Sequence, residues 1–388
     1  MRAMLRIVLI AVCAATAVRS YAEEKITPIV GYVLSEPRVA YMSDGTYAVN
    51  YELVVANATM SGYAIQEIRV VDPRRSDAVI KTLNADEIAR ESYVPGGNKS
   101  VSKLAPGLSG YIRINLVFRD KDTVPAEVEH VIVASAETPI PMVPEPSAGR
   151  VGRASVSSDR AVVIGPPMRG GNWVGVVIGA GGAHRKSIMP IGGTWVAPER
   201  WAVDWVQLAE TGKMLTGPIG KNESYPQYGR EIIAVADGRV VSAQDGMPDI
   251  PPGKPLPLQT IDEYPGNCIV QDIGGGYCAV YAHLQPGSLK VKTDDTVKKG
   301  QVIGLLGNSG NTTGPHLHFH IVHGTAPMGS DGVPYVIDAY TVRGTAVSSD
   351  DLQTQLERGE AVTMTAAKDS GRRTMEMPAD LAVVDFGK

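Results

Sequence analysis

One stretch of alternating histidines constrains the fold of this chain more than any other. Residues 311–322 read Asn-Thr-Thr-Gly-Pro-His-Leu-His-Phe-His-Ile-Val. Alternation with a period of two is typical of a β-strand, so His316, His318 and His320 are expected on one face and the apolar residues between them on the other. Neutral imidazole binds transition metals and titrates near pH 7, so this strand predicts a metal or proton-transfer site. Three of the chain's seven histidines lie within five residues, which argues against a chance row on the surface.

The composition favours strands and turns over long helices. The 388 residues include 42 Gly and 27 Pro but only 3 Phe and 4 Trp, and 44% of them are hydrophobic, which is enough for two or three domains. We therefore predict an all-β protein. A net charge of −4, without a basic run interleaved with aromatic residues, argues against nucleic-acid binding.

The first 22 residues resemble a secretory signal peptide. Arg2 and Arg6 precede an apolar run at 7–18, and Ser-Tyr-Ala at 20–22 fits the cleavage pattern. We predict an exported protein, periplasmic or extracellular, with an uncleaved anchor as the alternative. No later apolar stretch reaches the ~18 residues that a membrane-spanning helix needs, so no transmembrane segment is expected after signal removal.

Two cysteines remain in the mature chain, on either side of a three-glycine turn. Export would permit a disulfide. Pairing across the turn sets Cys278 opposite Asp272 and not opposite Cys268, so the register favours free thiols.

Residues 23–138 are predicted to form an immunoglobulin-like β-sandwich. Turn signals separate about seven short strands, as in that architecture. The clearest candidates are 47–55, 65–71, 109–118 and 127–134, with a short helix at 84–90. His130 stands alone here, so this domain is interpreted as a spacer or a binding platform for an envelope protein partner.

The composition changes twice after the sandwich. Residues 139–160 are rich in Pro, then in Gly and Ser, and predict an extended linker. Residues 161–345 are dense in Gly and predict an antiparallel, hairpin-built domain, with hairpins at 232–243 and 268–283. The tail at 346–388 is polar apart from 381–386, which predicts disorder or contact with a partner.

Several motifs of the second domain resemble the lysostaphin-type (LytM-like) zinc metallopeptidases. Gly-Asn-Ser-Gly-Asn-Thr-Thr-Gly-Pro-His-Leu-His-Phe at 307–319 resembles the signature strand of that family. Further similar segments follow the family's order: Glu-Arg-Trp-Ala-Val-Asp at 199–204, Ile-Ala-Val-Ala-Asp-Gly-Arg-Val at 233–240, Tyr-Ala-His-Leu-Gln-Pro-Gly at 281–287 and Val-Lys-Lys-Gly-Gln-Val-Ile-Gly at 297–304. The resemblance covers roughly residues 184–322. It implies a LytM-like antiparallel β peptidase domain with a surface groove and one zinc ion (Zn2+).

The resemblance assigns roles to four residues. His318 and Asp204 match zinc ligands, and His283 and His316 match the two catalytic histidines that lie beside the metal without binding it. The remaining ligand of the family is a His four residues before the Asp. Here that position is Arg200, which has no lone pair for a metal.

Another side chain must therefore complete the ligand set if zinc is bound. His184, twenty residues before Asp204, is one candidate. His320 is another, either as a ligand or as a hydrogen-bond partner of one. Arg200 is interpreted as a binding residue for a substrate carboxylate, and Tyr281, two residues before His283, as a second substrate-binding residue that donates to the oxyanion.

Two functions follow from the resemblance. The first is an exported zinc metalloendopeptidase that hydrolyses peptide bonds in peptidoglycan stem peptides or cross-links. The alternative is a catalytically inactive LytM-like protein that binds peptidoglycan or activates another cell-wall hydrolase. The retained site residues favour the enzyme, whereas Arg200 favours the binder. A structural or adhesive β-protein would explain the N-terminal half only.

Overall fold

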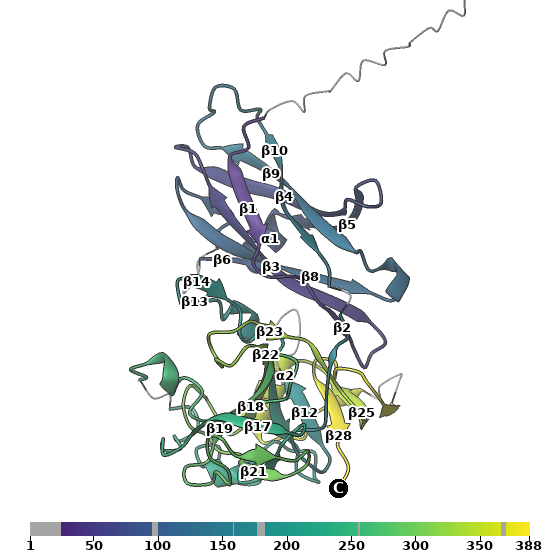
Figure 1. Ribbon diagram of the computed structural model, residues 1–388, viewed down its shortest axis with the longest axis vertical. Coiled ribbons are helices and arrows are strands. Elements are labelled where there is room, and N and C mark those ends of the chain that lie inside the picture. The colour runs from purple at the N-terminus through teal and green to yellow at the C-terminus, as the bar shows by residue number, and fades with distance from the viewer. Residues whose placement is uncertain (1–24, 95–99, 158, 177–182, 255–256, 366–369) are drawn as a thin grey trace, which may run out of the picture.

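The computed structural model describes residues 25–388 except 95–99, 158, 177–182, 255–256 and 366–369. Its two domains lie one above the other along the long axis, and nearly all of their regular structure is β, which confirms the all-β class (Figure 1). Within the described residues, no helix has the length and apolar character needed to cross a bilayer. The signal peptide predicted for 1–22 lies outside the described residues.

The N-terminal domain consists of two five-stranded sheets that share a core. One sheet has the order β1-β3-β8-β6 with β2 on β3, and the other has the order β10-β9-β4-β5 with β7 on β4. Val49, Leu53, Ile68 and Ile132 pack between them. The ten strands are β1 (Ile29–Val33), β2 (Val39–Tyr41), β3 (Tyr47–Asn57), β4 (Tyr63–Asp72), β5 (Ala78–Asn84), β6 (Ser92–Tyr93), β7 (Lys103–Leu104), β8 (Ser109–Phe118), β9 (Glu127–Ala136) and β10 (Ser147–Ser155).

The predicted short helix is α1 (Ala85–Glu91). The Asn84 side chain accepts a hydrogen bond from the Glu87 amide, and the Glu87 carboxylate accepts one from the Asn84 amide, so a capping box starts the helix. The two-sheet sandwich is present, and its immunoglobulin-like class stays a prediction.

The linker prediction is wrong for its second half. Residues 147–155 form β10, which pairs with β9 in the sandwich, with Ser147 opposite Ala134. Alternate residues of β10 are buried, so this segment has one face on the sandwich core, although its Gly and Ser content is typical of a linker.

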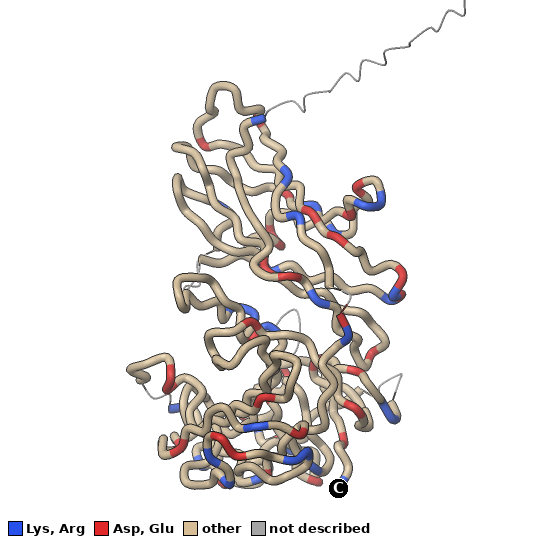
Figure 2. Tube along the Cα trace, in the orientation of Figure 1, with Lys and Arg blue, Asp and Glu red and all other residues tan. Residues whose placement is uncertain are grey.

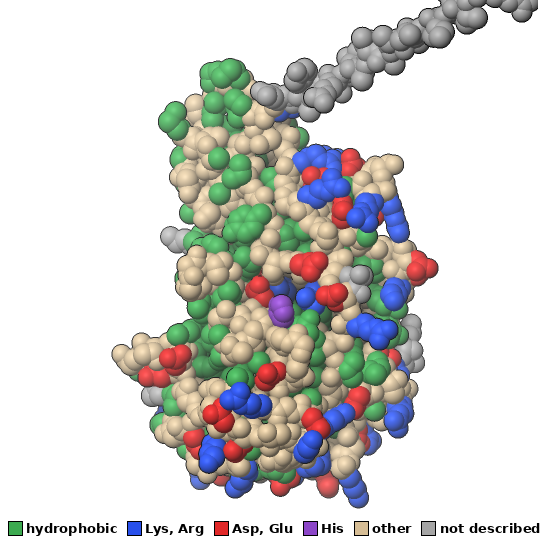
Figure 3. All heavy atoms as spheres, viewed as in Figure 1, with side chains coloured by type: hydrophobic (Ala, Val, Ile, Leu, Met, Phe, Trp, Pro, Cys, Tyr) green, Lys and Arg blue, Asp and Glu red, His purple; other side chains and the backbone are tan. Residues whose placement is uncertain are grey.

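Exposed hydrophobic side chains gather at the end of the sandwich that lies away from the second domain (Figure 3). Met60 and Met142 line a hollow there and are 95% and 86% exposed. The envelope partner predicted for the sandwich stays a prediction.

The C-terminal domain is organised around a large sheet with the order β20-β17-β18-β19-β22-β15-β12-β28-β25-β26; β23 pairs with β22 and β27 with β25. Small two-stranded sheets pair β11 with β24, β13 with β14 and β16 with β21. The first strands are β11 (Val162–Ile164), β12 (Trp173–Val176), β13 (Met189–Ile191), β14 (Thr194–Val196), β15 (Val203–Gln207), β16 (Glu231–Ile233), β17 (Gly238–Gln244), β18 (Asn267–Asp272) and β19 (Tyr277–Leu284). The rest are β20 (Thr296–Val297), β21 (Val302–Leu305), β22 (Leu317–His323), β23 (Gly332–Val333), β24 (Tyr335–Ile337), β25 (Tyr340–Ala346), β26 (Met364–Thr365), β27 (Gly371–Arg373) and β28 (Ala382–Asp385).

One of the two predicted hairpins is correct. Strands β18 and β19 pair across the three glycines with Asp272 opposite Cys278, and both cysteines are free. The hairpin predicted at 232–243 is wrong, because β16 pairs with β21 whereas β17 pairs with β18 and β20. The chain crosses between sheets at Ala234 and Val235, whose backbone groups bond to Gln301 and Gly165.

The tail is an integral part of the second domain, contrary to the prediction. Strand β28 lies between β12 and β25, with Val384 opposite both Trp173 and Val342. Val383 and Val384 are fully buried. The helix α2 (Ser349–Arg358) precedes it, starting at the N-cap Ser348 and ending at Gly359 in the left-handed conformation.

Replacing Val384 with Asp should therefore destabilise the whole second domain. The substitution places an unpaired carboxylate in an apolar core, and we expect a loss of about 3 kcal/mol or more in unfolding free energy, measured by urea denaturation. Val117→Asp, at a position that is 63% exposed, is the control and should cost about 1 kcal/mol or less. Equal stability of the two variants would show that the tail does not belong to the sheet.

Candidate functional site

The histidine strand is β22, and its two faces are divided as its alternation predicts. Leu317, Phe319 and Ile321 are fully buried in the main core of the second domain. Neighbouring strand β15 runs antiparallel, with Val203 opposite Phe319 and Asp204 opposite His318. Asp204 is therefore delivered beside His318 on the face opposite the core.

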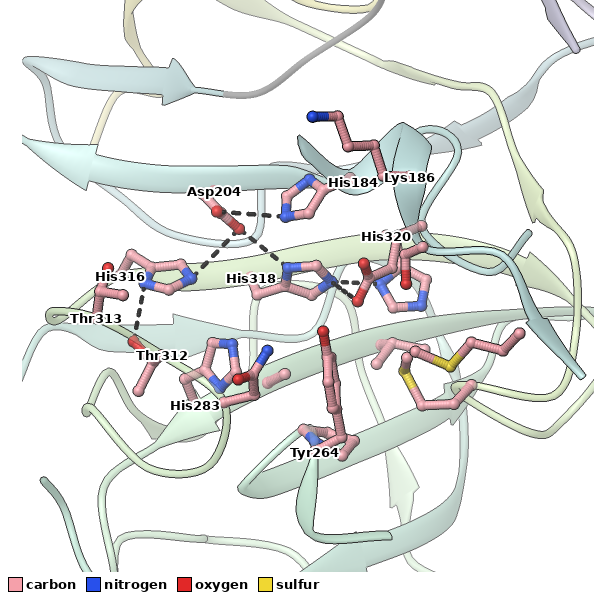
Figure 4. A pocket seen from close by; sticks show the side chains of 18 of the residues that line it. His184, Lys186, Asp204, Tyr264, His283, Thr312, Thr313, His316, His318 and His320 are labelled. Carbon is pink, nitrogen blue, oxygen red and sulfur yellow. Dashed lines mark hydrogen bonds and ion pairs between the residues drawn. The ribbon is translucent and has the colours of Figure 1, made fainter. Parts of the chain in front are cut away.

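A cavity of about 720 Å3 opens on this face. It is lined by six of the predicted or candidate site residues, from η2 (a 3-10 turn, Ala183–Lys186), β15, β19 and β22 and the turn before β22 (Figure 4): His184, Asp204, His283, His316, His318 and His320. Arg200 and Tyr281 do not line it.

Three of these side chains form a possible metal site. Nε2 of His184 lies 3.3 Å from Oδ2 of Asp204, and Nδ1 of His318 lies 3.0 Å from Oδ1 of Asp204. Two ligand atoms on a tetrahedral zinc ion are ~3.3 Å apart, given zinc–ligand bonds of ~2.0–2.1 Å. The ligand atoms of the three residues all lie within 4.8 Å of one another, so they could hold a zinc ion, with His184 as a third ligand in addition to Asp204 and His318.

A chain of hydrogen bonds supports His318 as a ligand. Nε2 of His320 lies 3.2 Å from the Pro327 carbonyl, which can only accept, so that nitrogen carries the proton. Nδ1 of neutral His320 then accepts from Nε2 of His318 at 3.0 Å. Nδ1 of His318 is left facing Oδ1 of Asp204 at 3.0 Å, which is hydrogen-bond distance. A proton or a metal ion between these two atoms would satisfy both, so Nδ1 is the atom that His318 could offer to a metal.

His320 hydrogen-bonds His318, which agrees with the second of the two roles left open for it. Both of its ring nitrogens are occupied by His318 and Pro327. Burial, followed by the neighbouring charge of His318, holds the pKa of His320 well below its usual value, which keeps it neutral.

His283 and His316 share one arrangement. Nδ1 of His283 donates to the Ser309 carbonyl at 2.8 Å, and Nδ1 of His316 donates to the Gly314 carbonyl at 2.8 Å. Nε2 of His316 lies 3.3 Å from Oδ1 of Asp204, whereas Nε2 of a neutral His283 ring is left with a lone pair. The two rings lie 4.8 Å apart between centroids. Together with His318 they form a second group that could hold a metal, but that set lacks a carboxylate to balance the ion's charge.

Charges in the cavity are strongly coupled. Burial by itself raises the pKa of Asp204, but His184 and His316 outweigh it and hold the pKa well below its usual range. Burial likewise lowers the pKa of His184, but Asp204 reverses this and raises the pKa to about 9. Asp204 also raises the pKa of His316, against the effect of burial. Burial, followed by the charges of His316 and His318, lowers the pKa of His283.

The role predicted for Tyr281 is wrong. Tyr281 is fully buried; its hydroxyl donates to Oε1 of Gln271 at 2.6 Å and accepts from the Val235 amide at 2.9 Å. The reason is a positive φ of 63° at His283, which breaks the alternation of β19. Tyr281 thus pairs with Phe319 on the core face, while His283 turns to the cavity.

The role predicted for Arg200 is also wrong. Its side chain is buried, and Nε donates to Oε2 of Glu52 in the sandwich at 2.8 Å. A guanidinium enclosed in this way is not available to a substrate carboxylate.

Sequence reasoning missed two residues of the cavity. The hydroxyl of Tyr264 points into it between His283 and His320 (Figure 4), and burial raises the pKa of Tyr264 to about 12. Glu199 lies 3.8 Å from Nε2 of His318. Glu199 opens the segment 199–204 and was visible there, whereas no pattern separates Tyr264 from the chain's other tyrosines.

The antiparallel sheet thus presents a cluster of Asp and His side chains that could hold a metal ion in a cavity. The family model for peptidase family M23 matches residues 224–330. The chain thus carries a LytM-like M23 peptidase domain, and the resemblance is confirmed. His283, His316 and His318 lie inside the matched residues, whereas His184 and Asp204 precede them.

Curated relatives match short segments. Peptidoglycan DD-endopeptidase ShyA of Vibrio cholerae serotype O1 is 44% identical over 59 residues, 15% of this chain and 13% of the relative. Peptidoglycan DD-endopeptidase ShyC of the same organism is 32% identical over 94 residues, 24% of this chain and 19% of the relative. An uncharacterized metalloprotease of Haemophilus influenzae is 36% identical over 115 residues, which are 28% of this chain and 22% of the relative. The chain thus spans less than a quarter of each relative.

Zinc binding should release a proton from His184. With a pKa of about 9, this imidazole is protonated at neutral pH and must lose its proton to bind a metal. The apparent zinc affinity should rise about tenfold per pH unit up to about pH 9 and then level off. Competition with a chelator, corrected for the chelator's own protonation, measures this; a flat profile in the unmodified chain, or an equally steep one in His184→Ala, would contradict it.

Replacing His320 with Ala should weaken zinc binding without abolishing it. The substitution removes the acceptor that orients His318, and such changes cost about 10–100-fold in metal affinity. His323→Ala, three residues along the same strand and exposed, is the matched control and should bind zinc normally. Complete loss of zinc in His320→Ala would make His320 a ligand.

Proposed function

We propose that this chain is an exported zinc metalloendopeptidase that hydrolyses peptide bonds in peptidoglycan stem peptides or cross-links. The observation that carries the proposal is the cavity in which Asp204, His184 and His318 meet beside two further histidines, His283 and His316. The M23 match and the relatives named as peptidoglycan DD-endopeptidases support the reaction and the substrate class.

His184, Asp204 and His318 would hold the zinc ion. When bound, zinc supplies a Lewis acid that lowers the pKa of water and polarises a peptide carbonyl. The carboxylate of Asp204 offsets part of the ion's charge, and the ring of His318 is kept in the ligand tautomer by His320.

His283 and His316 would move the protons of hydrolysis. His283 is neutral at physiological pH because its pKa is well below the usual value, so its Nε2 can accept a proton from water. The bond from its Nδ1 to the Ser309 carbonyl strengthens as the ring becomes positive. His316, whose pKa is raised, is suited to protonating the leaving amine.

Tyr264 takes the role that the sequence had suggested for Tyr281. Its hydroxyl lies in the cavity, and its raised pKa keeps it protonated, so it can donate a hydrogen bond to a carbonyl oxygen as that oxygen gains charge.

The surroundings of the site suit an extended peptide. A second cavity of about 590 Å3 is also lined by Asp204 and His316 and continues to α2, where Leu352 and Leu356 form part of its wall. The two cavities thus adjoin at the proposed catalytic residues. A chain of several residues, such as a stem peptide, would extend on both sides of the cleaved bond.

The inactive alternative loses its main argument. It rested on Arg200 in place of a ligand, but Arg200 is a partner of Glu52, and His184 lies where a third ligand is needed. Retention of His283 and His316 has no purpose in a protein that only binds.

Digestion of purified peptidoglycan by zinc-loaded protein tests the proposal. Chromatography of the released peptides should show cleavage by the unmodified chain and by His323→Ala. His316→Ala and His283→Ala should each lose about 10²–10⁴-fold in rate while keeping one zinc per chain, because they remove proton transfer only. His318→Ala should lose the metal as well. Zinc-loaded protein that binds peptidoglycan but releases no peptide would favour the inactive binder.

A further inference from the structure

We propose that the sandwich is part of the metal site: the buried carboxylate of Glu52 holds Arg185 and Arg200 and thereby positions the ligands His184 and Asp204. The inference rests on the proposed zinc site and adds a positioning residue from the other domain. Acidic and basic residues lie close together where the two domains meet (Figure 2).

Glu52 is buried, and a buried carboxylate destabilises the folded protein unless it is paired with cations or hydrogen-bond donors. It lies on β3 and is 1% exposed. Its Oε1 accepts from Nε of Arg185 at 3.1 Å, and its Oε2 accepts from Nε of Arg200 at 2.8 Å. Both arginines belong to the second domain and are buried as well. One sandwich side chain thus binds two cations of the other domain, one through each oxygen.

The segment that carries His184 is bonded to the sandwich through the two residues that follow it, Arg185 and Lys186. Arg185 also donates to Oδ1 of Asn115 at 2.6 Å and to the Tyr51 carbonyl at 3.0 Å. The Lys186 carbonyl accepts from the Tyr111 hydroxyl at 3.0 Å, and Nζ of Lys186 lies 5.0 Å from the centre of the Tyr93 ring. His184 itself faces Asp204. Besides its contact with Asp204, the position of its imidazole therefore depends on bonds from Arg185 and Lys186 to the sandwich.

Arg200 connects the same carboxylate to the second ligand segment. It lies four residues before Asp204, within the turn at 198–201 that precedes β15. Besides Glu52, it reaches the Gly332 carbonyl at 3.4 Å and lies 3.8 Å from Oδ1 of Asp331. Arg200, at the position where the resembled family has a zinc ligand, thus anchors the segment that leads to Asp204.

A buried ion-pair cluster of this kind is better suited to positioning than to stability. Desolvation of three charged groups offsets most of their attraction, while their geometry admits one arrangement of the two domains. Removing the central charge leaves two guanidinium groups buried without it, so the segments that they hold should move.

The test is a double-mutant cycle read out as zinc affinity, by chelator competition on the full mature chain. Glu52→Gln keeps the shape and removes the charge, and it should weaken zinc binding by about 10–100-fold. In a His184→Ala background the same substitution should have a smaller effect, because only Asp204 remains to be displaced. Glu129→Gln, which removes the sandwich ion pair with Arg150, is the matched control and should leave zinc affinity unchanged.

A second readout needs no metal. Amide hydrogen exchange at Ser187 and Ile188, which bond back to His184 and Lys186, should speed up in metal-free Glu52→Gln and, to a lesser extent, in Tyr111→Phe, which deletes one bond to the segment. Zinc affinity and exchange that are both unchanged in Glu52→Gln would overturn the inference. So would equal losses of zinc affinity with and without His184. If the unmodified chain bound no zinc, the proposed function would fail, while the exchange rates would still decide whether Glu52 holds the segment.

Discussion

The antiparallel register between β15 and β22 is the constraint on which the site depends. With Asp204 opposite His318 and Val203 opposite Phe319, one strand pair sends its apolar residues to the core and its ligands to the cavity. A slip of one residue would bury the Asp204 carboxylate against the aromatic core and expose Phe319. The fully buried Phe319, in edge contact with Tyr281 and Tyr335, therefore fixes the register of the proposed metal site from the opposite face of the sheet.

Hydrophobic alternation within a segment correctly predicted several strands and the face on which their side chains lie. The alternation at 316–321 gave the correct faces of β22, and the strands at 109–118 and 127–134 were also correct. Tyr281 was misplaced because one left-handed residue, His283, exchanges the faces of β19, and a non-glycine residue gives no sign of this in the sequence. The tail strand at 382–385 was missed because its buried residues are consecutive and show no period of two.

Arg200 was misread for a different reason, which is the distance along the chain to its partner. Glu52 lies 148 residues earlier, in another domain, and a pattern within one segment cannot reveal such a pair. With that partner known, Arg200 and His184 fit one arrangement. In the proposed ligand set His184 replaces the histidine that the resembled family has at the position of Arg200, and Arg200 and Arg185, the neighbour of His184, pair with the same Glu52 carboxylate.

The charges of the cavity explain how such a site stays assembled before a metal arrives. Asp204 is ionised at physiological pH and would repel the lone pairs of three nearby imidazoles, but the raised pKa values of His184 and His316 place protons between these groups. The protons hold Asp204 and His184 at nearly the separation that a zinc ion needs. A bound metal ion would replace the proton between His184 and Asp204 without a large movement of the segment that carries His184. In the proposed arrangement the Glu52 cluster already orders that segment, so metal binding would not have to supply the free energy for ordering it.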